Sequence, residues 1–87
     1  MKRFSDLKVG DKIYYTIYGT PREGKILSIS HNRNTNSKIF YTKDGSFEIE
    51  PEFIEKDFYI KEWSSGLVTN ISTSMDKLLI ELEDWLW

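Results

Sequence analysis

The residues that could perform acid–base or metal chemistry in this sequence are few. Its 87 residues include no cysteine and one histidine, His31, so thiolate chemistry and a zinc site are not expected. A lone histidine in an asparagine-rich segment is usually solvated rather than catalytic. The sequence also contains no glycine-rich phosphate-binding motif and no nucleophile motif. We therefore predict a protein that is not an enzyme and that holds no metal or cofactor.

Five carboxylates follow one another closely in the second half of the chain, at Glu48, Glu50, Glu52, Glu55 and Asp57. Their spacing differs from that of a calcium-binding EF-hand loop, so a solvated acidic edge is the simpler interpretation. Such an edge would attract a basic partner. These five residues are predicted binding residues.

The net charge of −2 conceals a basic first half and an acidic second half. Residues 1–45 contain nine Lys or Arg and four Asp or Glu, whereas residues 46–87 contain three and ten. In the basic half, cations for phosphate and tyrosines for base stacking would suit a single-stranded nucleic acid. The candidates are Lys12, Tyr14, Tyr18, Arg22, Lys25 and Arg33. The acidic overall balance makes nucleic-acid binding the second interpretation, after a packing role for the tyrosines.

Large aromatic side chains are the expected anchors for a protein partner, because such residues dominate binding energies at interfaces. The candidates are Tyr14, Tyr18, Trp63, Trp85 and Trp87. Ile80 and Trp87 fall outside the apolar stripe of a predicted C-terminal helix. A homodimer through that helix is therefore a third interpretation.

The elements that must position these residues begin with a predicted β-hairpin over residues 7–29. Period-two alternation from residue 12 predicts a strand, and residues 19–24, GTPREG, are predicted to be its loop. Lys12, Tyr14, Thr16 and Tyr18 are expected on the outer face. The residues expected to point inward are Ile13, Tyr15, Ile17, Leu27 and Ile29, with Ile26 outside.

A second hairpin is predicted around Asp44-Gly45, a dipeptide typical of two-residue turns in which both residues have positive φ. Before it, residues 30–37, SHNRNTNS, are predicted to form an exposed loop. The predicted turn pairs Thr42 with Phe47 and Phe40 with Ile49. These four side chains should share one face.

The last third of the chain is predicted to contain two strands and a helix. Pro51 should end a strand, residues 52–57 should form a turn or a short helical piece, and alternation predicts strands over residues 58–63 and 67–71. From residue 74 the apolar period becomes helical, and Thr73 with Asp76 is a weak match to a capping box. The predicted apolar face comprises Met75, Leu78, Leu79, Leu82, Trp85 and Leu86.

The run Val9-Gly10-Asp11-Lys12-Ile13, with a return through Gly24-Lys25-Ile26-Leu27, resembles the opening of SH3-like small barrels of the KOW and Tudor kind. The resemblance covers about residues 5–50 and is one of fold. It implies a strongly bent, five-stranded barrel that binds protein tails or nucleic acid through its loops and an outer aromatic patch. Similar openings occur in many short bacterial and phage proteins.

Together these patterns predict a mostly β single domain over residues 1–87. Residues 5–71 should form a small SH3-like barrel or a strongly curled antiparallel sheet, and residues 74–87 an amphipathic helix. No apolar run approaches the ~20 residues of a membrane span, so we expect a cytoplasmic protein with no membrane partner. The predicted function is non-catalytic binding of a protein, as in a phage-type accessory or inhibitor protein.

Overall fold

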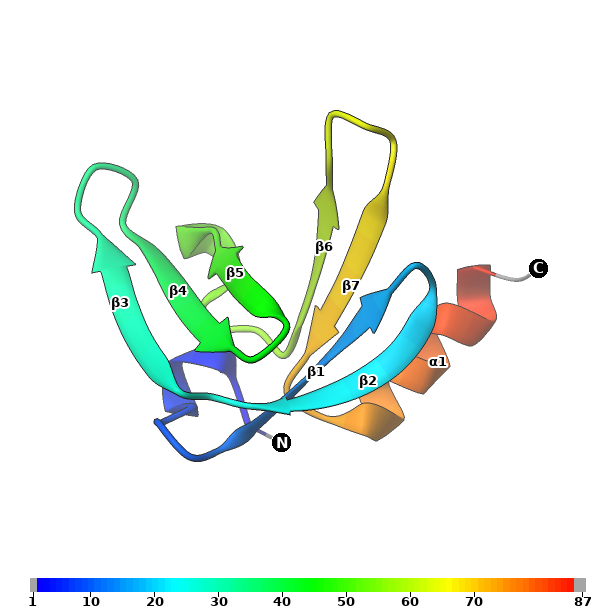
Figure 1. The fold of residues 1–87 in the computed structure, drawn as a ribbon, viewed down its shortest axis with the longest axis horizontal. Helices are drawn as coiled ribbons and strands as arrows, with labels where there is room; N and C mark the ends of the chain where they lie inside the picture. Colours follow the sequence, from blue (N-terminus) through cyan, green and yellow to red (C-terminus); the bar gives the residue numbers. More distant parts are fainter. Residues whose placement is uncertain (1, 86–87) are drawn as a thin grey trace.

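The protein consists of two antiparallel β-sheets and one C-terminal helix (Figure 1). The computed structural model describes residues 2–85, with the side chains of residues 84 and 85 outside that description. A four-stranded sheet has the order β2-β1-β7-β6 and a three-stranded sheet the order β3-β4-β5. The predicted mostly β class with a terminal helix is thus confirmed, in the form of curled open sheets. The elements are the 3-10 helices η1 (Phe4–Asp6) and η2 (Pro51–Phe53), strands β1 (Lys12–Ile17), β2 (Thr20–Lys25), β3 (Ser28–Asn32), β4 (Ser37–Thr42), β5 (Gly45–Ile49), β6 (Phe58–Glu62) and β7 (Val68–Ser72), and helix α1 (Met75–Trp85).

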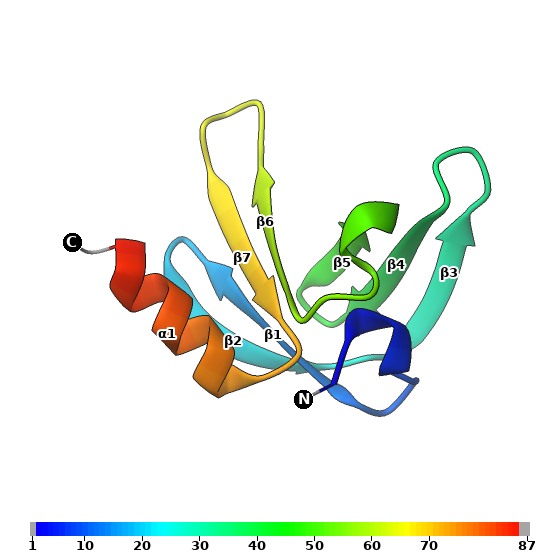
Figure 2. The same ribbon diagram turned by 180° about the vertical axis from the view of Figure 1, so that it is seen from behind.

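The two sheets open away from each other like a V, and the chain passes between them where β2 continues into β3 (Figure 1). The main core lies where the sheets converge. Helix α1 covers the other face of the four-stranded sheet, against β7, β2 and β1 (Figure 2). The fully or almost fully buried core side chains are Phe4, Leu7, Ile13, Tyr15, Ile26, Phe40, Ile49, Tyr59 and Ile71.

The first hairpin turns at Tyr18-Gly19, and the predicted loop over residues 19–24 is wrong. Both turn residues have positive φ, 50° and 80°, which matches the twist of the flanking strands. Ile17 therefore pairs with Thr20, and the segment expected to be a loop forms strand β2. Pro21 is tolerated there because β2 is an edge strand.

This tight turn also reverses the predicted orientation of Ile26 and Leu27. The register places Gly24 opposite Ile13 on the core face, and alternation then carries Ile26 into the core. Ile26 is fully buried and Leu27 is 57% exposed. Ile13 and Tyr15 are buried as predicted, whereas Ile17 and Ile29 pack only partly buried against the core.

The predicted exposed loop over residues 30–37 is confirmed only for residues 33–36, which form an exposed turn. Strand β3 extends to Asn32 and β4 begins at the buried Ser37. The connecting turn is stabilised by the Asn32 side chain, whose Oδ1 accepts a hydrogen bond from the Asn34 amide at 3.0 Å. Asn36 has positive φ, which asparagine tolerates better than most residues.

The second hairpin has the predicted faces but a register shifted by two residues. Thr42 pairs with Gly45 and Phe40 with Phe47, so Lys43 and Asp44 occupy the turn and only Gly45 takes a positive φ of 129°. A shift by an even number keeps every side chain on its side of the sheet. Phe40, Thr42 and Ile49 are therefore buried as expected, and Phe47 is partly buried.

The last third follows the prediction closely, with a 3-10 turn at Pro51, two strands and a helix. The residue capping the helix is Ser74, whose Oγ accepts from the Lys77 amide at 3.1 Å. Thr73, the predicted cap, instead donates to the Lys2 carbonyl at 2.6 Å. Leu78 is fully buried, whereas Leu79, expected on the same face, is exposed.

Candidate binding groove

The five predicted acidic residues separate into two groups. Glu48 and Glu50 lie on and just after β5, and Glu52 lies in η2, around one surface depression. Glu55 is elsewhere: its Oε2 is 3.0 Å from Nη1 of Arg3 and accepts from Ser5 Oγ. Asp57 supports the fold through its main-chain carbonyl, which accepts from Ser72 Oγ at 2.8 Å. Within residues 2–85 no three acidic or histidine side chains come together in a way that could hold a metal ion.

A groove opens between the three-stranded and the four-stranded sheet at the open end of the V. Its cavity volume is about 170 Å³. Strand β5 and the segment from β6 to Trp63 form its two sides, and β7 forms its floor. The lining residues are Ser46, Phe47, Glu48, Lys61, Trp63, Thr69 and Ile71. The groove thus brings together two predicted binding residues, Trp63 and Glu48.

Trp63 is held in a defined orientation although its side chain is 45% exposed. Its indole Nε1 donates to Thr69 Oγ1 at 3.0 Å. The ammonium of Lys61 lies 5.5 Å from the ring centroid, at cation–π distance. An exposed tryptophan that is already oriented loses little conformational entropy on binding.

A second, wider depression continues from the groove, because Glu48 and Lys61 line both. Its other charged members are Glu50 and Glu52, which lie beside the buried Tyr59. Burial raises the pKa of Tyr59 to about 12, and the neighbouring carboxylate of Glu50 adds to the shift. The raised pKa of Tyr59 therefore reflects the negative charge of this depression in addition to burial.

The elevated pKa of Tyr59 predicts a loss of stability at alkaline pH. Its folded-state pKa lies above the ordinary tyrosine value of 10.0, so this contribution is complete below pH 10 and is lost as the pH rises towards 12. We expect the Tyr59→Phe variant to lose about 2 kcal/mol less unfolding free energy across that interval than the parent. Urea unfolding at a series of pH values measures the difference.

Comparing the parent with Tyr59→Phe separates the contribution of Tyr59 from that of other groups that titrate in the same pH range. Burial also raises the pKa of Tyr15, and burial lowers that of Lys38. Lys38 has the opposite effect, because its pKa is lower in the folded protein than in the unfolded protein. The folded protein loses this proton first, so stability rises with pH until the unfolded protein has lost it as well. Equal alkaline slopes for the parent and Tyr59→Phe would contradict the prediction.

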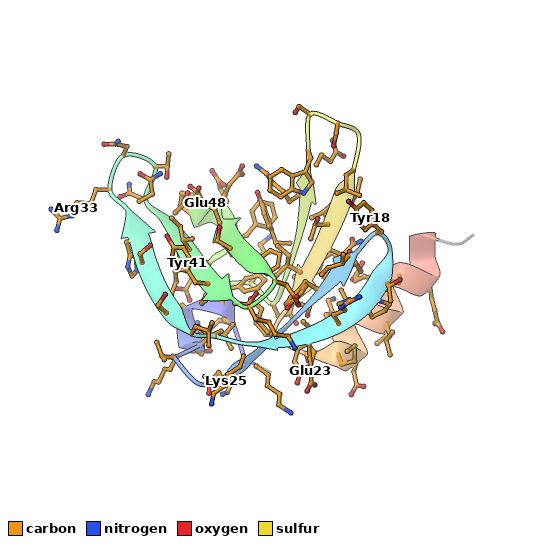
Figure 3. All side chains as sticks on the ribbon, in the orientation of Figure 1. Tyr18, Glu23, Lys25, Arg33, Tyr41 and Glu48 are labelled. Carbon is orange, nitrogen blue, oxygen red and sulfur yellow. The ribbon has the colours of Figure 1, made fainter. Side chains whose placement is uncertain are left out.

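Of the predicted nucleic-acid residues, Lys12 and Lys25 lie side by side, but the full set does not form one surface. Figure 3 places Arg33 at the tip of the β3–β4 hairpin, Tyr18 at the tip of the β1–β2 hairpin, and Lys25 between these ends. Tyr18 is 83% exposed, whereas Tyr14 is half-buried on the sheet face that α1 covers. Lys12 is paired with Glu23 at 3.3 Å. Arg22 is exposed on β2, and a shallow depression collects Lys12, Lys25 and Lys43 around Glu23.

The predicted aromatic anchors near the C-terminus lie outside the part of the chain that the structure describes. The side chain of Trp85 and the whole of Trp87 lie outside the described residues. Ile80 is exposed on α1 as predicted. In residues 2–85 no helix is both long and apolar enough to cross a membrane.

Five groove residues were not predicted as site residues: Ser46, Phe47, Lys61, Thr69 and Ile71. The alternation of residues 58–63 already put Lys61 and Trp63 on one face. What the sequence did not indicate is that β5 and β6 would face each other across a gap.

Comparisons with protein-family models, with curated proteins and with solved structures found no match.

Proposed function

We propose that this protein is a non-catalytic interaction module that binds a segment of a partner protein in the groove between β5 and β6. One observation carries the proposal: Trp63 is oriented by its bond to Thr69 and remains half-exposed beside Phe47 and Ile71. Tryptophan in a partly enclosed apolar setting is the residue type most enriched among binding hot spots. The SH3-like resemblance of residues 5–50 is in keeping with a binding role.

The groove dimensions favour a protein segment over a small-molecule ligand. Its volume of about 170 Å³ is below the ~300–1,000 Å³ of usual ligand pockets. It is suited to one large side chain with the adjoining backbone lying across the opening. The phage-type accessory role stays a prediction within this class of function.

The proposal is tested by selecting ligands from a displayed library of random peptides about ten residues long, the upper length of an ordinary strand. We expect selected peptides to bind Trp63→Ala at least about tenfold more weakly than the parent, as for a hot-spot residue. Tyr18→Ala is the matched control, because it removes an aromatic side chain that is more exposed than Trp63 and does not line the groove. Circular dichroism checks that both variants fold.

Two outcomes would contradict the proposed function. One is a selection that enriches no peptide above background. The other is a set of ligands that lose affinity for Tyr18→Ala and not for Trp63→Ala, which would move the binding surface to the first hairpin.

Single-stranded nucleic-acid binding has less support, because Arg33 and Tyr18 lie at different hairpin tips and Lys12 is paired with Glu23. A homodimer through α1 would use the exposed Leu79 and Ile80. Oligonucleotide titration at low salt and light scattering, respectively, test these two alternatives.

A further inference from the structure

We infer that the groove receives one extended, basic segment of a partner protein, which adds as a strand to the free edge of β5. This inference rests on the proposed function and specifies the chemistry of the partner. The recognised segment would alternate apolar side chains with Lys or Arg.

The first support is the position of the two strands in their sheets. β5 is the last strand of the three-stranded sheet, and β6 is the last strand of the four-stranded sheet. Each has one hydrogen-bonded neighbour within the described sheets, so alternate N–H and C=O groups of each point away from that neighbour. Such an edge is a template for a further strand.

The second support is charge. Glu48, Glu50 and Glu52 line the continuous surface beside β5, where Lys61 is the one basic residue. Within residues 2–85 none of these three carboxylates forms an ion pair. Glu48 instead accepts a hydrogen bond from Thr35 Oγ1 at 3.3 Å. The surface next to the edge therefore carries net negative charge that a basic strand would neutralise.

The third support is the alternation of β5 itself. Phe47 packs on Tyr15, with ring centroids 4.5 Å apart, and Ile49 is fully buried. Glu48, between them, is exposed on the other face of β5 and lines both the groove and the wider depression. In an added strand, side chains on the Phe47 face would lie in the groove beside Trp63, and the intervening ones would lie beside Glu48 and Glu50. Apolar and basic residues should consequently alternate in the ligand.

The charge requirement is tested with peptides selected from the displayed library. We expect them to contain Lys or Arg at alternate positions. We further expect their affinity to fall about tenfold in Glu48→Gln/Glu50→Gln/Glu52→Gln, each exposed charge contributing a small part. The control with the same net charge, Glu23→Gln/Glu55→Gln/Glu83→Gln, removes exposed carboxylates elsewhere and should bind like the parent.

Strand addition is tested separately with the strongest peptide. Two synthetic versions carry backbone N-methyl groups on either the odd or the even residues. We expect one version to lose binding and the other to keep it, because only alternate amides of an added strand face β5. Amide hydrogen exchange should show new protection in β5 and none in β3, the opposite edge of the same sheet.

Several results would overturn the inference while leaving the proposed function intact. These are Trp63-dependent peptides without basic residues, peptides that tolerate both N-methylation patterns, or protection that appears outside β5. A Trp63-dependent dimer seen by light scattering would make a second copy the occupant and would also overturn it. If the library gives no Trp63-dependent ligand at all, the proposed function itself fails.

Discussion

Phe40→Ala should destabilise the protein strongly, with an expected loss of about 3–5 kcal/mol in the free energy of unfolding. Phe40 is fully buried at the centre of the three-stranded sheet. Its ring lies 6.3 Å from that of Phe4 and 5.3 Å from the ammonium of Lys38. Removing it leaves a cavity between β4 and the N-terminal 3-10 helix.

The size of this loss matters because small domains have about 5–15 kcal/mol of total stability. The Lys38 ammonium is itself almost buried, and it donates to the carbonyls of Phe4 and Ser5 at 3.4 and 3.5 Å. Without the ring beside it, that charge would lose its cation–π contact as well as its packing. We expect a large fraction of Phe40→Ala to be unfolded at modest urea concentrations.

Tyr41→Ala is the matched control, because Tyr41 is the next residue on β4 and points to the other face. Its side chain is 38% exposed and shares one hydrogen bond of 3.3 Å with Ser30. Truncation there should change stability by about 0.5 kcal/mol. Urea unfolding followed by circular dichroism measures both variants. Similar losses for the two would mean that the core does not centre on Phe40.

Sequence patterns predicted the elements better than they predicted the turns. Alternation located β1, β6 and β7, and the change to a helical period located α1. The errors arose where a turn was placed by its most typical residues. Residues 19–24 were the predicted loop and Asp44-Gly45 the predicted turn, but the chain turns earlier, at Tyr18-Gly19 and at Lys43-Asp44.

The two turn errors had different consequences, and the physical reason is the two-residue period of a strand. Moving the first turn changed which residues after it face the core, so Ile26 and Leu27 exchanged roles. The shift at the second turn was even, so the faces of Phe40 and Phe47 survived. Hydrophobic pattern therefore predicts a face reliably only when the turn before it is correct or displaces the register by an even number of residues.

The groove could be predicted only in part, because it depends on contacts between distant segments. Trp63 and Glu48 were candidates for separate reasons, an aromatic anchor and an acidic edge. Their meeting follows from the order of strands in two sheets, which places β5 and β6 at facing edges. Local sequence contains no signal for which strands remain unpaired. Thr69, which orients Trp63, was unpredictable for the same reason.

Gly24→Ala should destabilise the protein by about 1–3 kcal/mol although it adds a single methyl group. Gly24 is buried in β2 opposite Ile13. A Cβ there would lie 2.9 Å from Cε1 and 3.1 Å from Cζ of Tyr15, and closer still to its Oη. Tyr15 cannot easily retreat: it is fully buried, it packs on Phe47, and its hydroxyl donates to Asp44 Oδ2 at 2.6 Å.

This close packing links stability to the groove. Displacing the Tyr15 ring would move Phe47, which lines the groove beside Trp63. We therefore expect Gly24→Ala to weaken the binding of Trp63-dependent peptides even at temperatures where it remains folded. Gly19→Ala is the contrasting variant: no atom lies within 4 Å of the added methyl, and its strain would come from a φ of 80° at a hairpin tip that does not line the groove. It should lose stability without losing peptide affinity.

A double-mutant cycle with Tyr15→Phe identifies the source of the strain. Removing the hydroxyl eliminates the shortest contact of the added methyl and frees the ring from Asp44. Gly24→Ala should consequently cost less in the Tyr15→Phe background than in the parent, with a coupling of about 0.5–1 kcal/mol. Urea unfolding of the parent, both single variants and the double variant gives this coupling directly. If the stability losses of Gly24→Ala and Tyr15→Phe were strictly additive, the tyrosine hydroxyl would not be what excludes a side chain at residue 24. The Tyr15–Phe47 contact would then not link core packing to the groove.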